Sequence, residues 1–232
     1  YRERGIPLDV IISDIDWYEY LCSPTEWNHE SYPDPEAMFE ALGQLNVRYG
    51  MINDPNVTDQ GNNQYFVDGD TNKYFIKNQS GNTKKVNWPW GAASGITDFF
   101  DPEARAWWGG QVQDLKAQGV EYIWMDMNEP SAYATDWLFW NEEGKSWGNI
   151  NEMKNALATM HNLSLYEAMT EDGGRAFLQT RGGFTGSHKY AAPWTGDIGT
   201  TWQDMYEQIR MGTGLSLCGY NYWGFDIGGS NG

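Results

Sequence analysis

The chain has 232 residues, with 15 Lys and Arg against 32 Asp and Glu, which gives a formal net charge of −17. Such an acidic chain is a poor partner for nucleic acid or for an anionic membrane, because both require a basic surface. It contains no apolar run long enough to cross a bilayer, whereas its 13 Trp, 14 Tyr and 9 Phe can build the core of one folded domain.

The first elements alternate between apolar runs and a helical pattern. Residues 8–13 form a short apolar run that ends at Asp14, which predicts a buried strand with an acid at its carboxyl end. Residues 34–36 (Asp-Pro-Glu) predict a helix start, with Asp as N-cap and Pro in the first turn, and apolar residues follow at helical spacing. Residues 47–53 predict the next strand, which runs into Asp54.

Residues 56–97 have a different composition, rich in Gly, Asn, Asp and Thr. Short alternating segments at 64–67 and 73–77 are separated by turn signals such as Asp68-Gly69-Asp70. This pattern predicts a β-rich insertion, built as a β-hairpin, on the loop after the second strand. A loop at that position would cover the carboxyl ends of the strands.

The strand–helix pattern returns after the insertion. Residues 101–103 (Asp-Pro-Glu) predict a second helix start, Gly119 a helix end, and residues 120–125 a strand that delivers Asp126. The further expected elements are a helix over 151–169, strands over 176–180 and 189–194, a helix over 201–211 and a strand over 220–225.

Six short strands with helices between several of them are typical of a parallel α/β architecture. A doubly wound sheet and a (β/α)8 TIM barrel both fit, but no Gly-rich phosphate loop follows any strand. Acids at successive strand ends favour the barrel, whose site is assembled from the carboxyl ends of many strands. We therefore expect an incomplete barrel with about strands 2–7, one strand preceding Tyr1 and one following Gly232.

Carboxylates dominate the residues available for chemistry. The acids expected at strand ends are Asp14, Asp16, Asp54, Asp126, Glu129, Asp197 and Asp226. A pair of such carboxylates is the minimal equipment for glycoside hydrolysis, and abundant aromatic rings suit the apolar faces of sugars. No metal-ligand cluster or cofactor motif is present in the sequence, so we expect neither. Spacing alone leaves open whether Cys22 and Cys218 pair.

The strand ending at Asp126 carries the most informative pattern. Alternate strand residues share a face, so Tyr122, Trp124 and Asp126 point the same way. Asp126 is then expected in the barrel mouth, with Trp124 one layer below it as a hydrophobic floor. A nearby donor such as Arg181 would favour the ionised carboxylate. On chemistry alone, Glu129 is a rival nucleophile.

Residues 124–129 (WMDMNE) resemble the WxDMNE signature of glycoside hydrolase family 31, the α-glucosidase family. Other blocks resemble the same family in the same order: residues 7–18, 98–104, 181–184 with 194–197, and 225–229. The resemblance implies that Asp126 is the catalytic nucleophile and Asp197 the general acid/base. It also implies that Asp14 and Arg181 bind hydroxyls of the sugar. The other residues implied in the pocket are Ile15, Ile52, Trp124, Trp194, Phe225 and Asp226, with a further ring from Trp88 or Trp90.

The implied function is a retaining α-glycosidase that hydrolyses α-linked glucosides through a covalent glycosyl-aspartate. A transglycosylase that uses the same site and a non-catalytic carbohydrate-binding barrel remain as alternatives. Expected partners are an oligosaccharide or glucoside substrate and, by resemblance, the remaining barrel strands and a β-sandwich of a longer parent chain. Linkage preference stays open, and the acidic composition favours a secreted or periplasmic location without establishing it.

Overall fold

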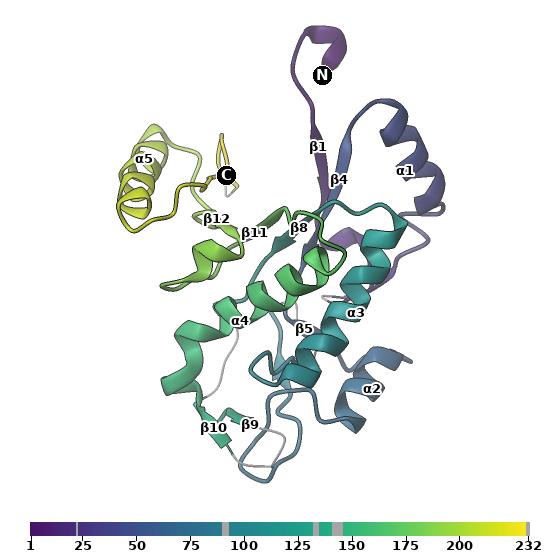
Figure 1. Cartoon of the computed structure of the whole chain (residues 1–232), viewed down its shortest axis with the longest axis vertical. Coiled ribbons are helices and arrows are strands. Elements are labelled where there is room, and N and C mark those ends of the chain that lie inside the picture. The colour runs from purple at the N-terminus through teal and green to yellow at the C-terminus, as the bar shows by residue number, and fades with distance from the viewer. Residues whose placement is uncertain (22, 90–92, 132–134, 141–145, 231–232) are drawn as a thin grey trace.

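The computed structural model describes the whole chain except residues 22, 90–92, 132–134, 141–145 and 231–232. Its centre is a five-stranded parallel sheet (Figure 1). The strands, in spatial order, are β1 (Val10–Ser13), β4 (Arg48–Asn53), β8 (Tyr122–Met125), β11 (Leu178–Thr180) and β12 (Ala192–Pro193). The sixth predicted strand, over residues 220–225, is reduced to one parallel bridge between Trp194 and Gly224.

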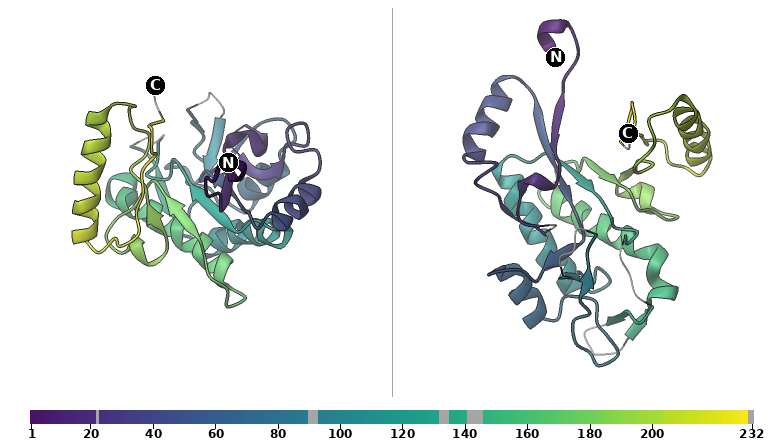
Figure 2. Two further views of the ribbon diagram at one scale, coloured as in Figure 1. Left: turned by 90° about the horizontal axis from the view of Figure 1, so that it is seen from above. Right: turned by 180° about the vertical axis from the view of Figure 1, so that it is seen from behind.

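The predicted helix starts are confirmed. The main helices are α1 (Pro35–Gln44), α3 (Pro102–Gln118), α4 (Ile150–Thr170) and α5 (Trp202–Leu217). The Asp34 side chain accepts the Ala37 N–H at 3.0 Å, and Asp101 accepts the Glu103 N–H at 2.9 Å. Each aspartate thus satisfies an amide that the first turn leaves unpaired. Viewed from above, α5 lies at one side of the sheet and α1 at the other (Figure 2).

Helices α1, α3 and α4 cover one face of the sheet. Phe39 of α1 packs edge-on against Tyr49 of β4, with ring centroids 5.3 Å apart. Trp108 of α3 donates its indole N–H to Asn53, two pleats further along the same strand face, at 3.2 Å. The core between sheet and helices includes Met51, Trp108, Val112, Ile123, Met125, Leu157 and Leu165.

The other face of the sheet is open. Ile12 on that face is 44% exposed, and a hollow of about 360 Å³ is lined there by Tyr122, Gln179 and residues 221–224. A doubly wound sheet would carry helices on both faces. The open face corresponds instead to the interior of a barrel wall that does not close.

The insertion differs from its prediction. Its strands β5 (Asn56–Thr58), β7 (Ala93–Ile96) and β6 (Val86–Asn87) form an antiparallel sheet. The strand predicted at 64–67 is wrong, because this segment begins helix α2 (Gln64–Thr71). Four alternating residues cannot discriminate strand from helix.

Two local contacts stabilise α2. The Asn63 side chain accepts the N–H groups of Tyr65 and Phe66 at the helix start. Phe66 then stacks on Phe75, with ring centroids 5.3 Å apart. The segment predicted as a strand at 73–77 makes only isolated bridges, from Phe75 and Lys77.

Shorter elements complete the described chain. Two antiparallel hairpins that the sequence did not indicate are β2 (Tyr18–Tyr20) with β3 (Ser23–Trp27) and β9 (Leu138–Trp140) with β10 (Ser146–Asn149). Single 3-10 turns lie at η1 (Arg2–Arg4), η2 (Ile15–Trp17) and η3 (Ser187–Lys189). Cys22 is outside the described residues, and Cys218 is exposed at the end of α5. Among the described helices, none combines the length and apolarity needed to span a membrane.

Candidate active site

The parallel register brings the candidate residues to one edge of the sheet. The aligned last residues of β4, β8 and β11 are Asn53, Met125 and Thr180. Asp54, Asp126 and Arg181 come directly after them, so they lie side by side at the carboxyl end of the sheet. Because strand side chains alternate, these three follow the face of the sheet opposite the helices, where Asp54 and Asp126 are buried.

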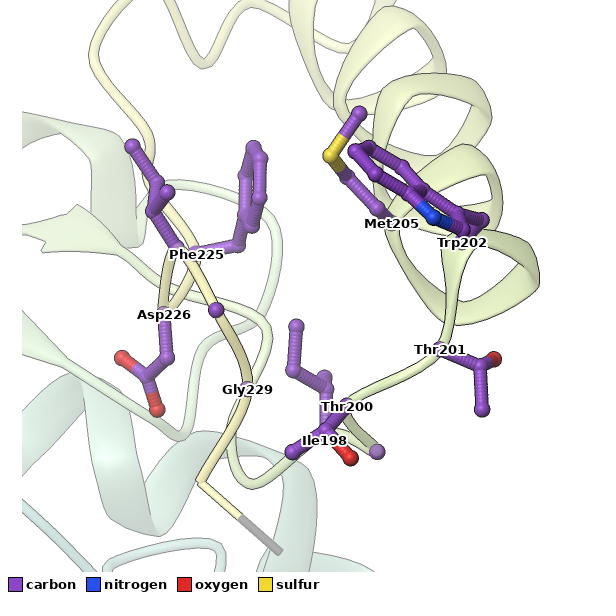
Figure 3. Close-up of a pocket in the computed structure, with 11 residues that line it drawn as sticks. Ile198, Thr200, Thr201, Trp202, Met205, Phe225, Asp226 and Gly229 are labelled. Carbon is purple, nitrogen blue, oxygen red and sulfur yellow. The ribbon is translucent and has the colours of Figure 1, made fainter. Parts of the chain in front are cut away.

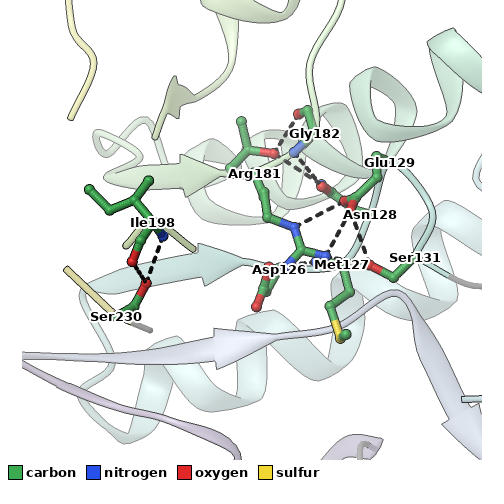
Figure 4. Close-up of polar contacts among 10 residues, drawn as sticks. Asp126, Met127, Asn128, Glu129, Ser131, Arg181, Gly182, Ile198 and Ser230 are labelled. Atoms are coloured by element: carbon green, nitrogen blue, oxygen red, sulfur yellow. Dashed lines mark hydrogen bonds and ion pairs between the residues drawn. The ribbon is translucent and has the colours of Figure 1, made fainter. Parts of the chain in front are cut away.

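Asp126 is held by two donors. Arg181 Nη1 lies 2.9 Å from Asp126 Oδ1, and the Met127 N–H donates to the same oxygen at 2.7 Å (Figure 4). The left-handed backbone of Met127, with φ of 54°, turns this amide back onto the carboxylate. Burial raises the pKa of Asp126 to about 6, while the Arg181 charge and the Met127 amide oppose that rise.

Glu129 is bound on both oxygens by the same guanidinium. Arg181 Nη2 donates to Oε1 at 2.7 Å and Nε donates to Oε2 at 3.2 Å. The Ser131 hydroxyl also bonds both Arg181 and Glu129 (Figure 4). A carboxylate that accepts two hydrogen bonds from one guanidinium holds that guanidinium in a fixed orientation beside Asp126.

A buried amide network behind the site was not anticipated from the sequence. The Asn128 side chain donates to Thr180 Oγ1 at 3.0 Å and to Asn162 at 3.2 Å, and it accepts the Gly182 N–H at 2.8 Å. It therefore ties the ends of β8 and β11 to α4. The signal in the sequence is only the proximity of Asn128 to Asp126.

His161 of α4 extends this network to β4. Its Nε2 lies 3.2 Å from Asn53 Oδ1, and its Nδ1 lies 3.3 Å from Asn128 Nδ2. Burial lowers the pKa of His161 to about 3, so the ring is neutral at physiological pH. A neutral ring with one donor and one acceptor suits this position between two amides.

Two glycines allow close packing around Arg181. A Cβ at Gly182 would lie 2.7 Å from both Ala158 Cβ and Asn128 Oδ1, so no other residue fits there. Gly196, with φ of 76°, passes the Arg181 side chain at a distance that leaves little room for a Cβ. This turn carries the chain from β12 to Asp197.

Asp197 is exposed in the same mouth. Its negative charge makes a minor contribution that raises the pKa of both Asp126 and Arg181, so Asp197 lies near enough to act on both groups. The Ile198 N–H donates to Ser230 Oγ at 2.9 Å, fastening this loop to the last described segment (Figure 4). Asp226 lies within the field of Asp197, and burial raises its pKa.

The remaining predicted residues surround this centre. Trp124 and Trp194 meet edge-on, with ring centroids 5.5 Å apart, beneath the acids. Ile52 is buried, and Asp14 is exposed beyond β1, where it accepts the Ile15 N–H at 2.7 Å. Trp88 is buried, whereas Trp90 lies outside the described residues.

Phe225 and Asp226 line a separate hollow of about 270 Å³ next to Asp197. Figure 3 shows Phe225 on one side of this hollow, with Trp202 and Met205 of α5 on the other. It thus offers apolar surface beside the proposed acid/base. In the described part of the chain, no group of His, Cys, Asp and Glu side chains is arranged to hold a metal ion.

The parallel sheet, with helices on one face and acids at its carboxyl edge, has the architecture of a partial TIM-barrel domain. The family model for the glycosyl hydrolases family 31 TIM-barrel domain matches residues 1–231. The chain therefore belongs to this family of glycoside hydrolases, which confirms the resemblance and the barrel fold.

Individual relatives agree with the family. Alpha-glucosidase 2 of Bacillus thermoamyloliquefaciens is 32% identical over 235 residues, covering 99% of this chain and 30% of the relative. Neutral alpha-glucosidase C of Macaca fascicularis is 31% identical, and the match covers 99% of this chain and 31% of the relative. The chain thus spans less than a third of the length of these relatives.

Solved structures agree as well. The Flavobacterium johnsoniae GH31 dextranase in complex with glucose has a TM-score of 0.89 at 28% identity, with 100% of this chain and 29% of that chain covered. A structure of a glucosidase II alpha subunit has a TM-score of 0.90 at 26% identity, and the match covers 100% of this chain and 26% of that chain.

Proposed function

We propose that this chain carries the catalytic pair of a retaining α-glycosidase that hydrolyses α-linked glucosides. Asp126 is the nucleophile and Asp197 the general acid/base. The supporting observation is the position of Asp126, clamped by Arg181 at the carboxyl edge of the sheet and coupled by charge to Asp197. Similarity to proteins named alpha-glucosidases supports the choice of α-glucosides as substrate.

In the first step, the ionised Asp126 attacks the anomeric carbon of the bound sugar. Both contacts to Asp126 fall on Oδ1, so we assign the attack to Oδ2. Asp197 gives its proton to the departing glycosidic oxygen as the carbon–oxygen bond breaks. The product of this step is a glycosyl-aspartate ester.

In the second step, Asp197 takes a proton from water, and the water oxygen attacks the same carbon. The ester bond breaks, Asp126 leaves as a carboxylate, and the configuration of the sugar is retained. A sugar hydroxyl in place of water would give transglycosylation from the same intermediate.

The surrounding residues are assigned to sugar binding. Asp14 accepts hydrogen bonds from sugar hydroxyls, and Arg181 donates hydrogen bonds to them. The rings of Trp124, Trp194 and Phe225 supply apolar surface, which matches the C–H faces of a hexose. Ile15, Ile52 and Asp226 are assigned to the same sugar-binding pocket.

Covalent trapping tests the proposal directly. The protein, expressed from its complete open reading frame, is treated with a fluorinated glucosyl fluoride that forms the intermediate quickly and releases it slowly. Peptide mass spectrometry is expected to find the label on Asp126. A label on Glu129 would overturn the assignment, and a folded protein that takes no label would favour a non-catalytic carbohydrate-binding barrel. Product analysis at high maltose concentration separates hydrolysis from transglycosylation.

The pH dependence of kcat/KM is a second test. Asp126 must be ionised to attack, so kcat/KM is expected to fall about tenfold per unit as the pH drops below about 6. The Arg181 charge lowers the pKa of Asp126, so Arg181→Gln should move this acid limb to higher pH. Arg210→Gln removes an exposed arginine paired with Glu207 and serves as control. An acid limb that stays in place in Arg181→Gln would contradict the assignment.

A further inference from the structure

Asp54 is a buried acid at the strand end next to that of the proposed nucleophile, Asp126. It follows Asn53, the register partner of Met125, so it neighbours Asp126 at the carboxyl edge of the sheet. The Asp126 N–H lies 3.4 Å from the Asn53 carbonyl oxygen, which brings the two strand ends together. Asp54 has 0% of its surface exposed. The mechanism described above gives it no task.

The environment of the Asp54 carboxyl group is poor in hydrogen-bond donors. Neither carboxyl oxygen has a hydrogen-bond partner among the residues that the structure describes. The indole N–H of Trp88 is near enough to favour the ionised form, but it makes no hydrogen bond of acceptable geometry to either oxygen. An ionised carboxylate that is buried without donors is strongly disfavoured, so the neutral acid is the form that this site accommodates.

The charges around Asp54 act in the same direction. Asp126 and Asp14 face it with negative charge, and both raise its pKa in addition to burial. Arg181 opposes them, but its guanidinium is already paired with Asp126 and Glu129. One cation cannot compensate a third carboxylate, so burial and the two neighbouring carboxylates together favour the protonated form of Asp54.

We propose that Asp54 is a positioning residue that stays a neutral carboxylic acid and acts through Asp126. As a polar neighbour without charge, it fills the space beside the nucleophile and leaves the Arg181 guanidinium to Asp126. The negative charge of the pair then resides on the attacking carboxylate. The effect on turnover rests on the proposed function, whereas the protonation state of Asp54 does not.

Infrared difference spectroscopy tests the protonation state without any assay of activity. The spectrum of the protein minus that of Asp54→Asn, recorded at pH 7.5, is expected to contain the carbonyl stretch of one protonated carboxylic acid. Asp136→Asn is the matched control, because Asp136 is paired with Lys84 and the pKa of its carboxyl group is lowered. Absence of the protonated-acid band in the Asp54 difference would overturn the proposal.

Kinetics test the positioning role. Asp54→Asn replaces a neutral acid with a neutral amide, so it should keep kcat within about threefold and leave the acid limb of kcat/KM unmoved. Asp54→Leu has similar volume but no polar atoms, and it should lower kcat about tenfold or more with little change in KM. Thermal unfolding confirms that both variants are folded.

Two kinetic outcomes would contradict the role of Asp54. A downward shift of the acid limb in Asp54→Asn would show that a charge had been removed beside Asp126. An unchanged kcat in folded Asp54→Leu would show that Asp54 does not act on the nucleophile. If the protein has no glycosidase activity at all, the proposed function fails, while the infrared result still decides the protonation state.

Discussion

Asp126→Asn is expected to lower kcat for 4-nitrophenyl α-glucoside by at least about 10⁴-fold, the scale of loss seen when a nucleophile is removed. The amide has nearly the shape of the carboxylate and can still accept the Met127 N–H on its oxygen. It has no negative charge with which to form the glycosyl ester, so the reaction has no first step. Steady-state assay of the purified, folded variant measures the loss.

The control for this experiment is another Asp→Asn change far from the mouth. Asp172 is an exposed acid beyond α4 that pairs with Lys116 at 2.8 Å. Asp172→Asn should retain the activity of the parent protein. If Asp126→Asn kept more than about 1% of kcat, the nucleophile would have to be sought elsewhere, with Glu129 as the first candidate.

Asp197→Ala is expected to show a loss that depends on the leaving group. Hydrolysis of maltose needs a proton on the departing sugar oxygen, so kcat/KM should fall about 10²–10⁴-fold, the usual contribution of a positioned general acid. The 4-nitrophenyl leaving group departs without that proton, so its glycosyl-enzyme still forms. Turnover of this substrate should then stall at the second step, because no base activates water.

Azide distinguishes this variant from the nucleophile variant. Azide is already an anion and needs no general base, so it should restore turnover of Asp197→Ala on the activated substrate. Attack of azide on the ester intermediate gives the α-glucosyl azide, with the configuration of the substrate. NMR of the product identifies the anomer. Failure of rescue, or formation of the β-anomer, would remove Asp197 from the acid/base role.

Local features of the chain were predictable because their causes are local. Asp34 and Asp101 cap their helices as expected, since a side-chain oxygen within a few residues of free amides needs no tertiary partner. The apolar run before Asp126 was predictable as a strand from its composition, although its pairing with β4 and β11 is a tertiary contact. Residues 64–67 were misassigned, because the cap at Asn63 and the packing of Phe66 on Phe75 outweigh four residues of alternation.

The candidate site also has features that the sequence predicted and features that only the structure shows. Position at a strand end marked Asp126 and Asp54 equally, and both are buried, so their partners separate them: Asp126 is paired with Arg181, while neither oxygen of Asp54 has a hydrogen-bond partner among the described residues. The chemistry of Glu129 left it a rival nucleophile, and only the structure shows that both of its oxygens accept hydrogen bonds from Arg181. The network of Asn128 with His161 has no signature in the sequence, because its members are more than 30 residues apart.

The sequence by itself determined the strand–helix order of the parallel sheet, although not helix α2 or the two hairpins. It also determined the acids that follow the strands and the resemblance to family 31 carried by residues 124–129 and the other blocks. Only the tertiary structure decided which acids share a guanidinium, which acid is buried with no hydrogen-bond partner among the described residues, and which face of the sheet is open. The physical reason is that hydrogen-bond geometry and burial depend on groups brought together from distant strands. The sequence specifies which side chains can ionise, but the free-energy cost of the ionised form depends on the groups that surround it in the fold.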